Sequence, residues 1–133
     1  MNTTYFLNLI AGNVFHSDTE TAIPTNYYLG LSTTTPTVSG TGVSEPSSNS
    51  GYKRLLIDSF TVPSNGTVAN TSVLRFPIST DNWGVVTHYV IYDAETGGNL
   101  LMYAALKNSK TIEADTLSVF DVEDIALSVA NAS

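Results

Sequence analysis

The chain has 133 residues, enough for one domain, and its composition is globular, with 42% hydrophobic and only 13% charged residues. Five Lys and Arg stand against twelve Asp and Glu, a net charge of -7, which argues against binding to nucleic acid or to anionic membrane surfaces, because both need clustered cations. The absence of Cys excludes disulfides, thiol catalysis and thiolate metal sites. No apolar run approaches the roughly 20 residues of a membrane span, and the N-terminal residues lack the basic region of a signal peptide.

The first segment in chain order, residues 3–16, predicts a short helix. Apolar residues recur on one helical stripe: Phe6, Leu9, Ile10 and Val14. Thr3 or Thr4 is the expected N-cap, and Gly12 opposes the helix by about 1 kcal/mol. The helix is expected to pack on the sheet of its own domain; the alternative is an arm that docks on another subunit.

Strand patterns follow the helix, separated by polar turns. Residues 27–31 alternate as a strand, and the segments 52–62 and 67–78 continue the pattern on either side of an Asn-Gly turn. Between the first two lies a long polar loop, residues 35–51, which is interpreted either as a partner-binding loop or as a crossover between sheets. Residues 110–129 predict two or three further short strands. The sequence therefore predicts a mostly β, antiparallel β-sandwich or flattened barrel with one short N-terminal helix, as a single domain over residues 1–133.

Residues 83–106, "WGVVTHYVIYDAETGGNLLMYAAL", predict a hairpin closed by Gly97 and Gly98. Strict alternation places two mostly apolar sets on opposite faces of its first strand: Val85, Thr87, Tyr89 and Ile91 on one, and Val86, His88, Val90 and Tyr92 on the other. The return strand, residues 100–106, is apolar on both faces as well. Both strands are therefore expected in the centre of a sheet, covered by a second sheet, a helix or a neighbouring subunit.

His88 is the residue of this hairpin whose side chain is best suited to catalysis. A catalytic His needs a nucleophile or an orienting carboxylate nearby, and the nearest acids, Asp81 and Asp93, lie at the two ends of the strand. His88 is therefore predicted to be a buried, neutral, structural residue that donates to a backbone carbonyl or a Tyr hydroxyl.

Three other groups of residues are candidates for a catalytic, metal-binding or sugar-binding site, and a structural role is the interpretation favoured for each. Asp93 and Glu95 resemble a glycosidase carboxylate pair but lie in a hairpin turn. An acidic cluster that lacks the spacing of an EF-hand follows later: Asp121, Glu123 and Asp124. The aromatic residues Trp83 and Tyr52 are candidates for a sugar-binding platform or for core anchors. Four N-x-Ser/Thr triplets, which begin at Asn2, Asn65, Asn70 and Asn131, predict nothing in a chain rich in Ser and Thr. No catalytic, cofactor-binding or metal-binding residue is predicted.

The order of these motifs resembles a family of small proteins and domains of tailed bacteriophages and prophages, usually labelled tail fibre proteins. The resemblance runs from about Tyr5 to Phe120, and its most specific parts are the segments "WGVVTH" and "GGNLL", with "LSTTTP" and "NGTVANT" in support. The last segment, "DVEDIALSVANAS", departs from the pattern in being more acidic.

The resemblance implies a structural component of a virion rather than an enzyme, with no cofactor. It implies binding to other virion proteins of the capsid or tail, self-association as a homo-oligomer, and assembly in the cytoplasm of the host bacterium. Two roles stay open: a capsid decoration or cement protein, and a tail-fibre or tail-associated adaptor. The alternative from another class is a receptor- or carbohydrate-binding module, which needs Tyr52 or Trp83 to be exposed.

Overall fold

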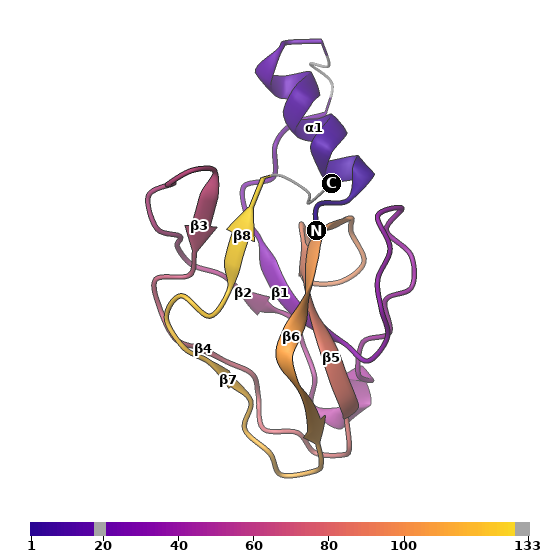
Figure 1. The fold of residues 1–133 in the computed structure, drawn as a ribbon. Helices are drawn as coiled ribbons and strands as arrows, with labels where there is room; N and C mark the ends of the chain where they lie inside the picture. Colours follow the sequence, from indigo (N-terminus) through magenta and orange to yellow (C-terminus); the bar gives the residue numbers. More distant parts are fainter. Residues whose placement is uncertain (18–20, 130–133) are drawn as a thin grey trace.

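The computed structural model describes residues 1–17 and 21–129, and within them the chain is mostly β with one α-helix at its N-terminal end (Figure 1). The helix is α1 (Thr4–Val14), and a short 3-10 turn, η1, spans Ser48–Ser50. The strands are β1 (Tyr28–Ser32), β2 (Leu55–Leu56), β3 (Thr67–Ala69), β4 (Leu74–Arg75), β5 (Gly84–Tyr92), β6 (Leu100–Ile112), β7 (Val119–Phe120) and β8 (Ala126–Ser128).

The strands form two layers. One is a four-stranded antiparallel sheet in the order β2-β1-β5-β6, and the other consists of two antiparallel pairs, β3–β8 and β4–β7. The main core cluster lies between the layers and includes Leu31 and Ile91 from the sheet with Leu74 and Leu127 from the pairs. The predicted antiparallel, sandwich-like β fold is confirmed, and the sheets formed by residues 1–17 and 21–129 do not close into a barrel.

Helix α1 lies within the predicted range 3–16 and begins at the predicted cap. The Oγ1 atom of Thr3 accepts a hydrogen bond from the Phe6 amide at 3.2 Å, and the same hydroxyl donates to the Leu100 carbonyl at 2.7 Å. Phe6 and Leu9 face the core, whereas Val14 is exposed. The single stripe expected from Phe6 to Val14 is therefore wrong, because residues eight apart on an α-helix differ by about 80° in direction.

The residues before the helix, Met1 to Thr3, lie alongside β6 and form backbone hydrogen bonds with it. Thr3 donates its amide to the Leu101 carbonyl at 2.9 Å, and Tyr103 donates to the Met1 carbonyl at 3.0 Å. The side-chain amide of Asn2 donates to the Ser128 carbonyl of β8 at 2.9 Å. The base of α1 is thus hydrogen-bonded to both layers.

The hairpin β5–β6 contains an irregularity that the alternation did not predict. Val86 pairs with Lys110, but His88 pairs with Ala105, so residues 106–109 bulge opposite Thr87. Because a bulge breaks the alternation of side chains, Val86 faces the core together with Tyr89 instead of sharing a face with His88.

The long polar loop 35–51 covers the outer face of the main sheet. Val43 of this loop packs against a second apolar cluster, Val90, Tyr92 and Leu100. The loop joins β1 to β2, which are neighbours in one sheet, so its interpretation as a crossover between sheets is wrong. The central position predicted for the hairpin holds for β5 but not for β6, which lies at the sheet edge and is largely exposed beyond Ala104.

The predicted strand 67–78 is broken in two by Asn70. Its buried side-chain amide donates to the carbonyls of Ser72 and Asp121 at 2.8 and 2.9 Å, and its Oδ1 accepts from the Ile125 amide at 2.9 Å. These side-chain hydrogen bonds take the place of the backbone hydrogen bonds of a strand. They stabilise a corner at which the chain passes from the β3–β8 pair to the β4–β7 pair.

Candidate interaction surface

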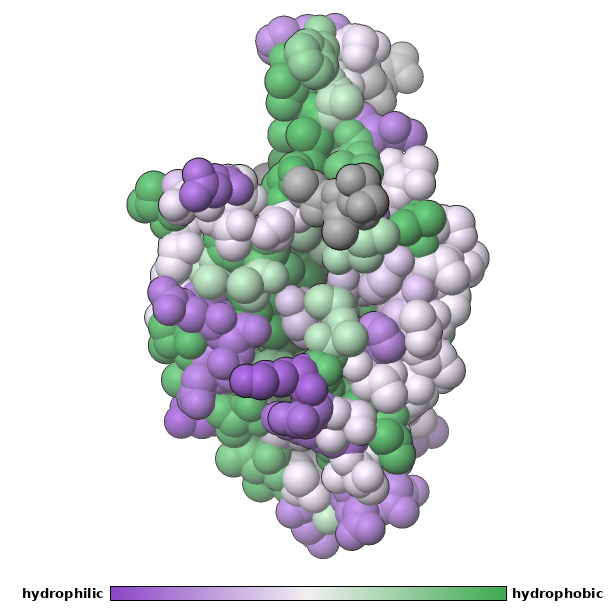
Figure 2. Space-filling view, viewed as in Figure 1, coloured by the Kyte–Doolittle hydropathy of each residue, from purple (hydrophilic) through white to green (hydrophobic). Residues whose placement is uncertain are grey.

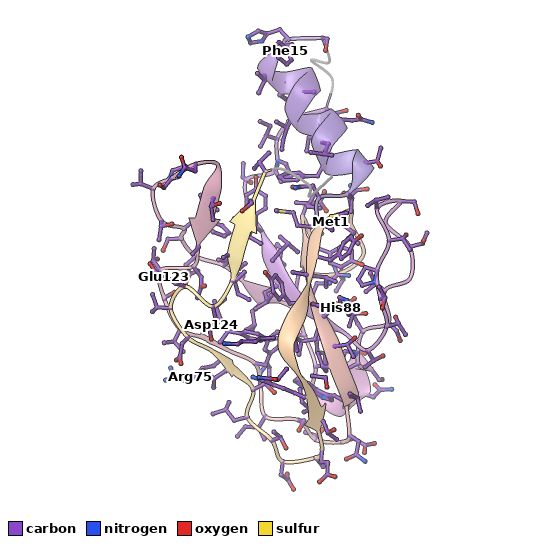
Figure 3. The ribbon with its side chains drawn as sticks, in the orientation of Figure 1. Met1, Phe15, Arg75, His88, Glu123 and Asp124 are labelled. Carbon is purple, nitrogen blue, oxygen red and sulfur yellow. The ribbon has the colours of Figure 1, made fainter. Side chains whose placement is uncertain are left out.

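Helix α1 is uncharged and apolar on two sides. No Asp, Glu, Lys or Arg occurs from Thr4 to Val14. One side packs on the core. The neighbouring side has apolar residues at i, i+3, i+4 and i+7 spacing, here called the outer stripe: Leu7 and Ile10 are half-buried, with Ile10 against the core cluster, and Ala11 and Val14 are exposed. Val14 is 59% exposed and the adjoining Phe15 78%. Phe15 stands at the far tip of the projecting helix (Figure 3). The free end of α1 therefore leaves apolar side chains in contact with solvent, at Val14 and Phe15.

An apolar groove lies at the base of the helix, at the same end of the sandwich. It has a volume of about 300 Å³ and is lined by Phe6, Tyr27, Phe60, Pro63, Gly66, Val68, Ile91, Leu101, Met102, Leu127 and Val129, and is here called the end groove. None of these residues is charged. In Figure 2, apolar green atoms run along much of the projecting helix, while purple hydrophilic atoms lie at its tip and over the body. Neither the helix nor the lining of the end groove contains a charged residue, on a chain with a net charge of -7.

The polar loop on the opposite face is held by a buried ion pair. Arg54, 8% exposed, binds Glu45 through both carboxylate oxygens at 2.8 and 2.9 Å. The Nη1 atom of Arg54 donates to the carbonyls of Ala94 and Gly97 at 2.8 and 2.7 Å. The guanidinium carbon lies 3.5 Å from the centre of the Tyr92 ring. One side chain therefore joins the 35–51 loop, the main sheet and the turn between β5 and β6. Sequence reasoning missed this pair, since nothing local links the two residues.

Tyr52 extends the same cluster and makes the fold sensitive to high pH. Its hydroxyl donates to Glu45 Oε1 at 2.6 Å and accepts from the Leu31 amide at 3.0 Å. Burial first, and then the neighbouring Glu45 carboxylate, raise the pKa of Tyr52 well above its ordinary value. Burial also raises the pKa of Tyr89 and of Tyr92.

These raised Tyr pKa values predict loss of stability in alkali. A group whose pKa is higher in the folded state stabilises the fold fully below its unfolded pKa, which is about 10 for Tyr, and that stabilisation falls as the pH rises above it. Urea unfolding measured from pH 8 to 11.5 should show a decline that begins near pH 10, and Tyr52→Phe should make the decline shallower. A slope identical to that of the wild type would show that Tyr52 does not contribute.

Trp83 and Tyr52 are core residues, 4% and 7% exposed. The indole Nε1 donates to the Ser50 carbonyl at 2.9 Å, and the Trp83 ring contacts Tyr52 and Phe76 edge-on with centroids 5.4 and 6.0 Å apart. The sugar-binding platform considered for these two residues is therefore wrong, and Trp83 is a core anchor.

His88 is half-buried rather than buried, and it lies on the outer face of β5, which it shares with Val90 and Tyr92. Its Nδ1 lies 2.8 Å from the Thr87 hydroxyl, in place of the carbonyl or Tyr partner expected from the sequence. Burial lowers the pKa of His88. The ring is therefore held by a neighbour on its own strand.

A lowered His pKa predicts mild acid sensitivity. The folded state binds the proton less readily than the unfolded state, so the contribution of His88 is complete above the unfolded pKa of about 6.5 and falls as the pH drops below it. Between pH 7.5 and 5.5 the wild type should lose more stability than His88→Gln, and at pH 7.5 the two should differ by about 1 kcal/mol or less. Parallel stability curves over this range would contradict the assignment.

The acidic residues considered as sites stabilise turns. The Asp93 carboxylate accepts from the backbone and side-chain amides of Asn99 at 2.7 and 3.0 Å and closes the β5–β6 turn, while Glu95 is exposed beside it. Asp124 Oδ2 accepts from the Asp121 amide at 2.8 Å. Glu123 and Asp124 line a surface hollow together with Lys107 and Lys110 of β6. No group of three His, Asp or Glu suited to a metal ion occurs within residues 1–17 and 21–129.

The four N-x-Ser/Thr triplets lie in different surroundings. Asn2 and Asn70 are fully buried, and Asn65 lies in an exposed turn with a φ of 53°. Asn131 lies outside the described residues. Burial makes the first two unsuitable as acceptors of a bulky modification.

Comparison with known proteins identifies the family. No helix in the described part of the chain is long and apolar enough to cross a membrane, and no curated protein matches the chain significantly. A family model described as "Podophage GP4 fiber I protein gp80" matches residues 2–128, which confirms the resemblance to phage tail fibre proteins. The chain therefore belongs to the podophage GP4 fiber I protein gp80 family and is a tail-associated structural protein of a phage virion.

Proposed function

We propose that this chain is a single-domain, non-enzymatic assembly module of the phage tail, whose helix α1 and end groove attach it to protein partners in the particle. The observation that carries the proposal is the uncharged α1, with the Ala11 and Val14 end of its outer stripe exposed beside Phe15. Burying a Val or Ile side chain contributes about 1.5–3 kcal/mol, so a partner that covers the stripe gains affinity without having to pair charges.

The rest of the surface supports attachment through this one region. The acidic side chains are distributed over the loops and turns of the body, for example at Asp81, Glu95 and Asp115. Repulsion between such acidic surfaces disfavours non-specific association, whereas the helix and the end groove carry no charge. The burial of Trp83 and Tyr52 removes the aromatic pair that favoured a carbohydrate-binding module. The match to a phage fibre family favours a tail adaptor over a capsid decoration protein.

Incorporation into particles tests the proposal. Val14→Glu places a charge on the outer stripe, and Ile78→Glu is the matched control, since Val14 and Ile78 are 59% and 58% exposed. Both variants should fold, because both positions are exposed. Quantitative mass spectrometry of purified particles should show at least a tenfold loss of the chain with Val14→Glu and normal amounts with Ile78→Glu. Normal incorporation of a folded Val14→Glu chain would refute the proposal.

A further inference from the structure

We propose that Asn65 is a site of spontaneous deamidation, and that this reaction slowly changes the rim of the end groove. The side-chain amide of Asn65 is the reacting group, the backbone nitrogen of Gly66 is the nucleophile, and water is the co-reactant. The reaction itself does not depend on the proposed function; its consequence for attachment rests on that function.

Asn65 and Gly66 are the two central residues of a tight hairpin turn. Ser64 and Thr67 exchange both backbone hydrogen bonds across it, each at 3.0 Å. The φ angles of Asn65 and Gly66 are 53° and 76°, and positive φ at both central residues defines a type I′ turn. Both residues are exposed, and a Cβ atom placed on Gly66 would meet no other atom within 4 Å. Both reacting groups are therefore accessible to solvent, and no side chain on Gly66 shields its nitrogen.

The freedom of the Gly66 amide distinguishes Asn65 from other asparagines of the chain. Within residues 1–17 and 21–129, neither the Gly66 amide nor the Asn65 side chain has a hydrogen-bond partner. The amide that follows Asn82 donates to the Ile112 carbonyl at 2.8 Å. Asn70 is fully buried, and both ends of its side chain are hydrogen-bonded. A bonded amide must lose its hydrogen bond before its nitrogen can attack, whereas the Gly66 amide has none to lose.

The backbone of this turn can reach the geometry that ring closure needs. The Gly66 nitrogen has to turn toward the side chain of Asn65, which requires rotation of the peptide between the two residues. That rotation converts a type I′ turn into a type II′ turn and keeps φ positive at Asn65. Both turn types suit a two-residue hairpin, and the rotating peptide has no hydrogen bond to another described residue that would be broken.

The chemistry balances with water alone. The Gly66 nitrogen attacks the side-chain carbonyl carbon of Asn65, and its proton passes through solvent to the departing NH2 group. The bond between that carbon and the NH2 group breaks, so ammonia leaves and a five-membered succinimide remains. Water then opens the ring at either carbonyl carbon. One opening gives aspartate at position 65, and the other gives isoaspartate, whose backbone runs through the side chain and is longer by a methylene group.

Either product changes a rim that is otherwise uncharged. Gly66 and Pro63 line the end groove, and the Gly66 carbonyl accepts from the Val129 amide at 3.0 Å. Both products add a negative charge beside this lining, on a chain whose net charge is already -7. Isoaspartate also lengthens a two-residue loop, and loop length fixes the register of a hairpin. Deamidation at Asn65 should therefore weaken attachment through the end groove as a particle ages.

Peptide mapping of the aged chain tests the site. The purified wild-type chain is incubated at mildly alkaline pH, digested, and analysed by mass spectrometry for the exchange of NH2 for OH. Conversion at position 65, with isoaspartate among the products, should be about tenfold or more faster than at Asn82, whose following amide has a hydrogen bond to lose. Asn65→Gly is the matched control, because Gly keeps the positive φ and lacks the amide, and its turn peptide should stay unchanged. An unconverted Asn65, or earlier conversion at Asn70 or Asn82, would overturn the inference.

Incorporation into particles then tests the consequence. Aged wild-type chain should enter particles severalfold less than fresh chain, whereas aged and fresh Asn65→Gly chains should enter equally. Equal entry of converted and unconverted wild-type chain would refute the effect on the groove rim, and Val14→Glu would still decide the proposed function separately. If position 65 stays unconverted while Val14→Glu fails to enter particles, the inference fails and the proposed function stands.

Discussion

Replacing Arg54 with Met should lower the free energy of unfolding by about 3–5 kcal/mol, the usual cost of removing one partner of a buried ion pair. Arg54 provides both bonds to Glu45 and the bonds to the carbonyls of Ala94 and Gly97. Met keeps much of the packing on Tyr92 but leaves the carboxylate and both carbonyls without this donor. Urea unfolding at pH 7, followed by far-UV circular dichroism, measures the loss.

The neighbouring residue provides the control. Lys53 is exposed, so Lys53→Met should change stability by about 0.5 kcal/mol or less. Adding Glu45→Gln to Arg54→Met should recover part of the loss, because it removes the unpaired charge. A loss below about 1 kcal/mol for Arg54→Met would show that solvent reaching Glu45, whose side chain is 22% exposed, replaces the ion pair.

Trp83→Ala should also cost about 3–5 kcal/mol, as large-to-small changes of buried aromatic residues do. The indole fills the space between Tyr52 and Phe76 and donates to the Ser50 carbonyl. Trp83→Phe should cost less, about 1–2 kcal/mol, because the Thr80 amide also donates to that carbonyl, at 2.8 Å, and keeps it partly satisfied.

The exposed Phe15 provides the comparison for the aromatic core. Phe15→Ala should leave the stability of the purified chain within about 0.5 kcal/mol of the wild type. Thermal unfolding of the three variants should therefore rank Phe15→Ala as most stable, then Trp83→Phe, then Trp83→Ala. Equal effects of Trp83→Phe and Trp83→Ala would mean that the hydrogen bond, rather than packing, is what Trp83 contributes.

The local features of the fold could be predicted from the sequence. Thr3 caps α1, Gly97 and Gly98 form the turn of the β5–β6 hairpin with positive φ, and the strand predicted at residues 27–31 is found one residue later, at 28–32. Each of these depends on residues that are close in sequence, where periodicity, capping and turn preferences act. The tail fibre family was indicated separately, by the resemblance of segments such as "WGVVTH" to known proteins, and the family model confirms it.

The features that depend on distant residues could not be predicted. The bulge opposite Thr87 follows from the register with β6, and the corner at Asn70 needs Asp121 and Ile125 in place. The interaction surface was predicted only in part: α1 was recognised as an apolar helix that packs on its sheet or docks elsewhere. The position of β6 determines which side of α1 is buried and which is exposed. No local sequence pattern reveals that position.

The hydrogen bond from Asn2 to Ser128 joins residues 126 positions apart, and this separation has a consequence for synthesis. A ribosome adds about 5–20 residues each second, so Asn2 waits roughly 6–25 s before Ser128 exists to accept its hydrogen bond. Helix α1 itself contacts β6, which is synthesised earlier than β8. The bond between the N-terminal residues and β8 is therefore among the last to form, and the apolar side of α1 is open to premature association until its partners have been made.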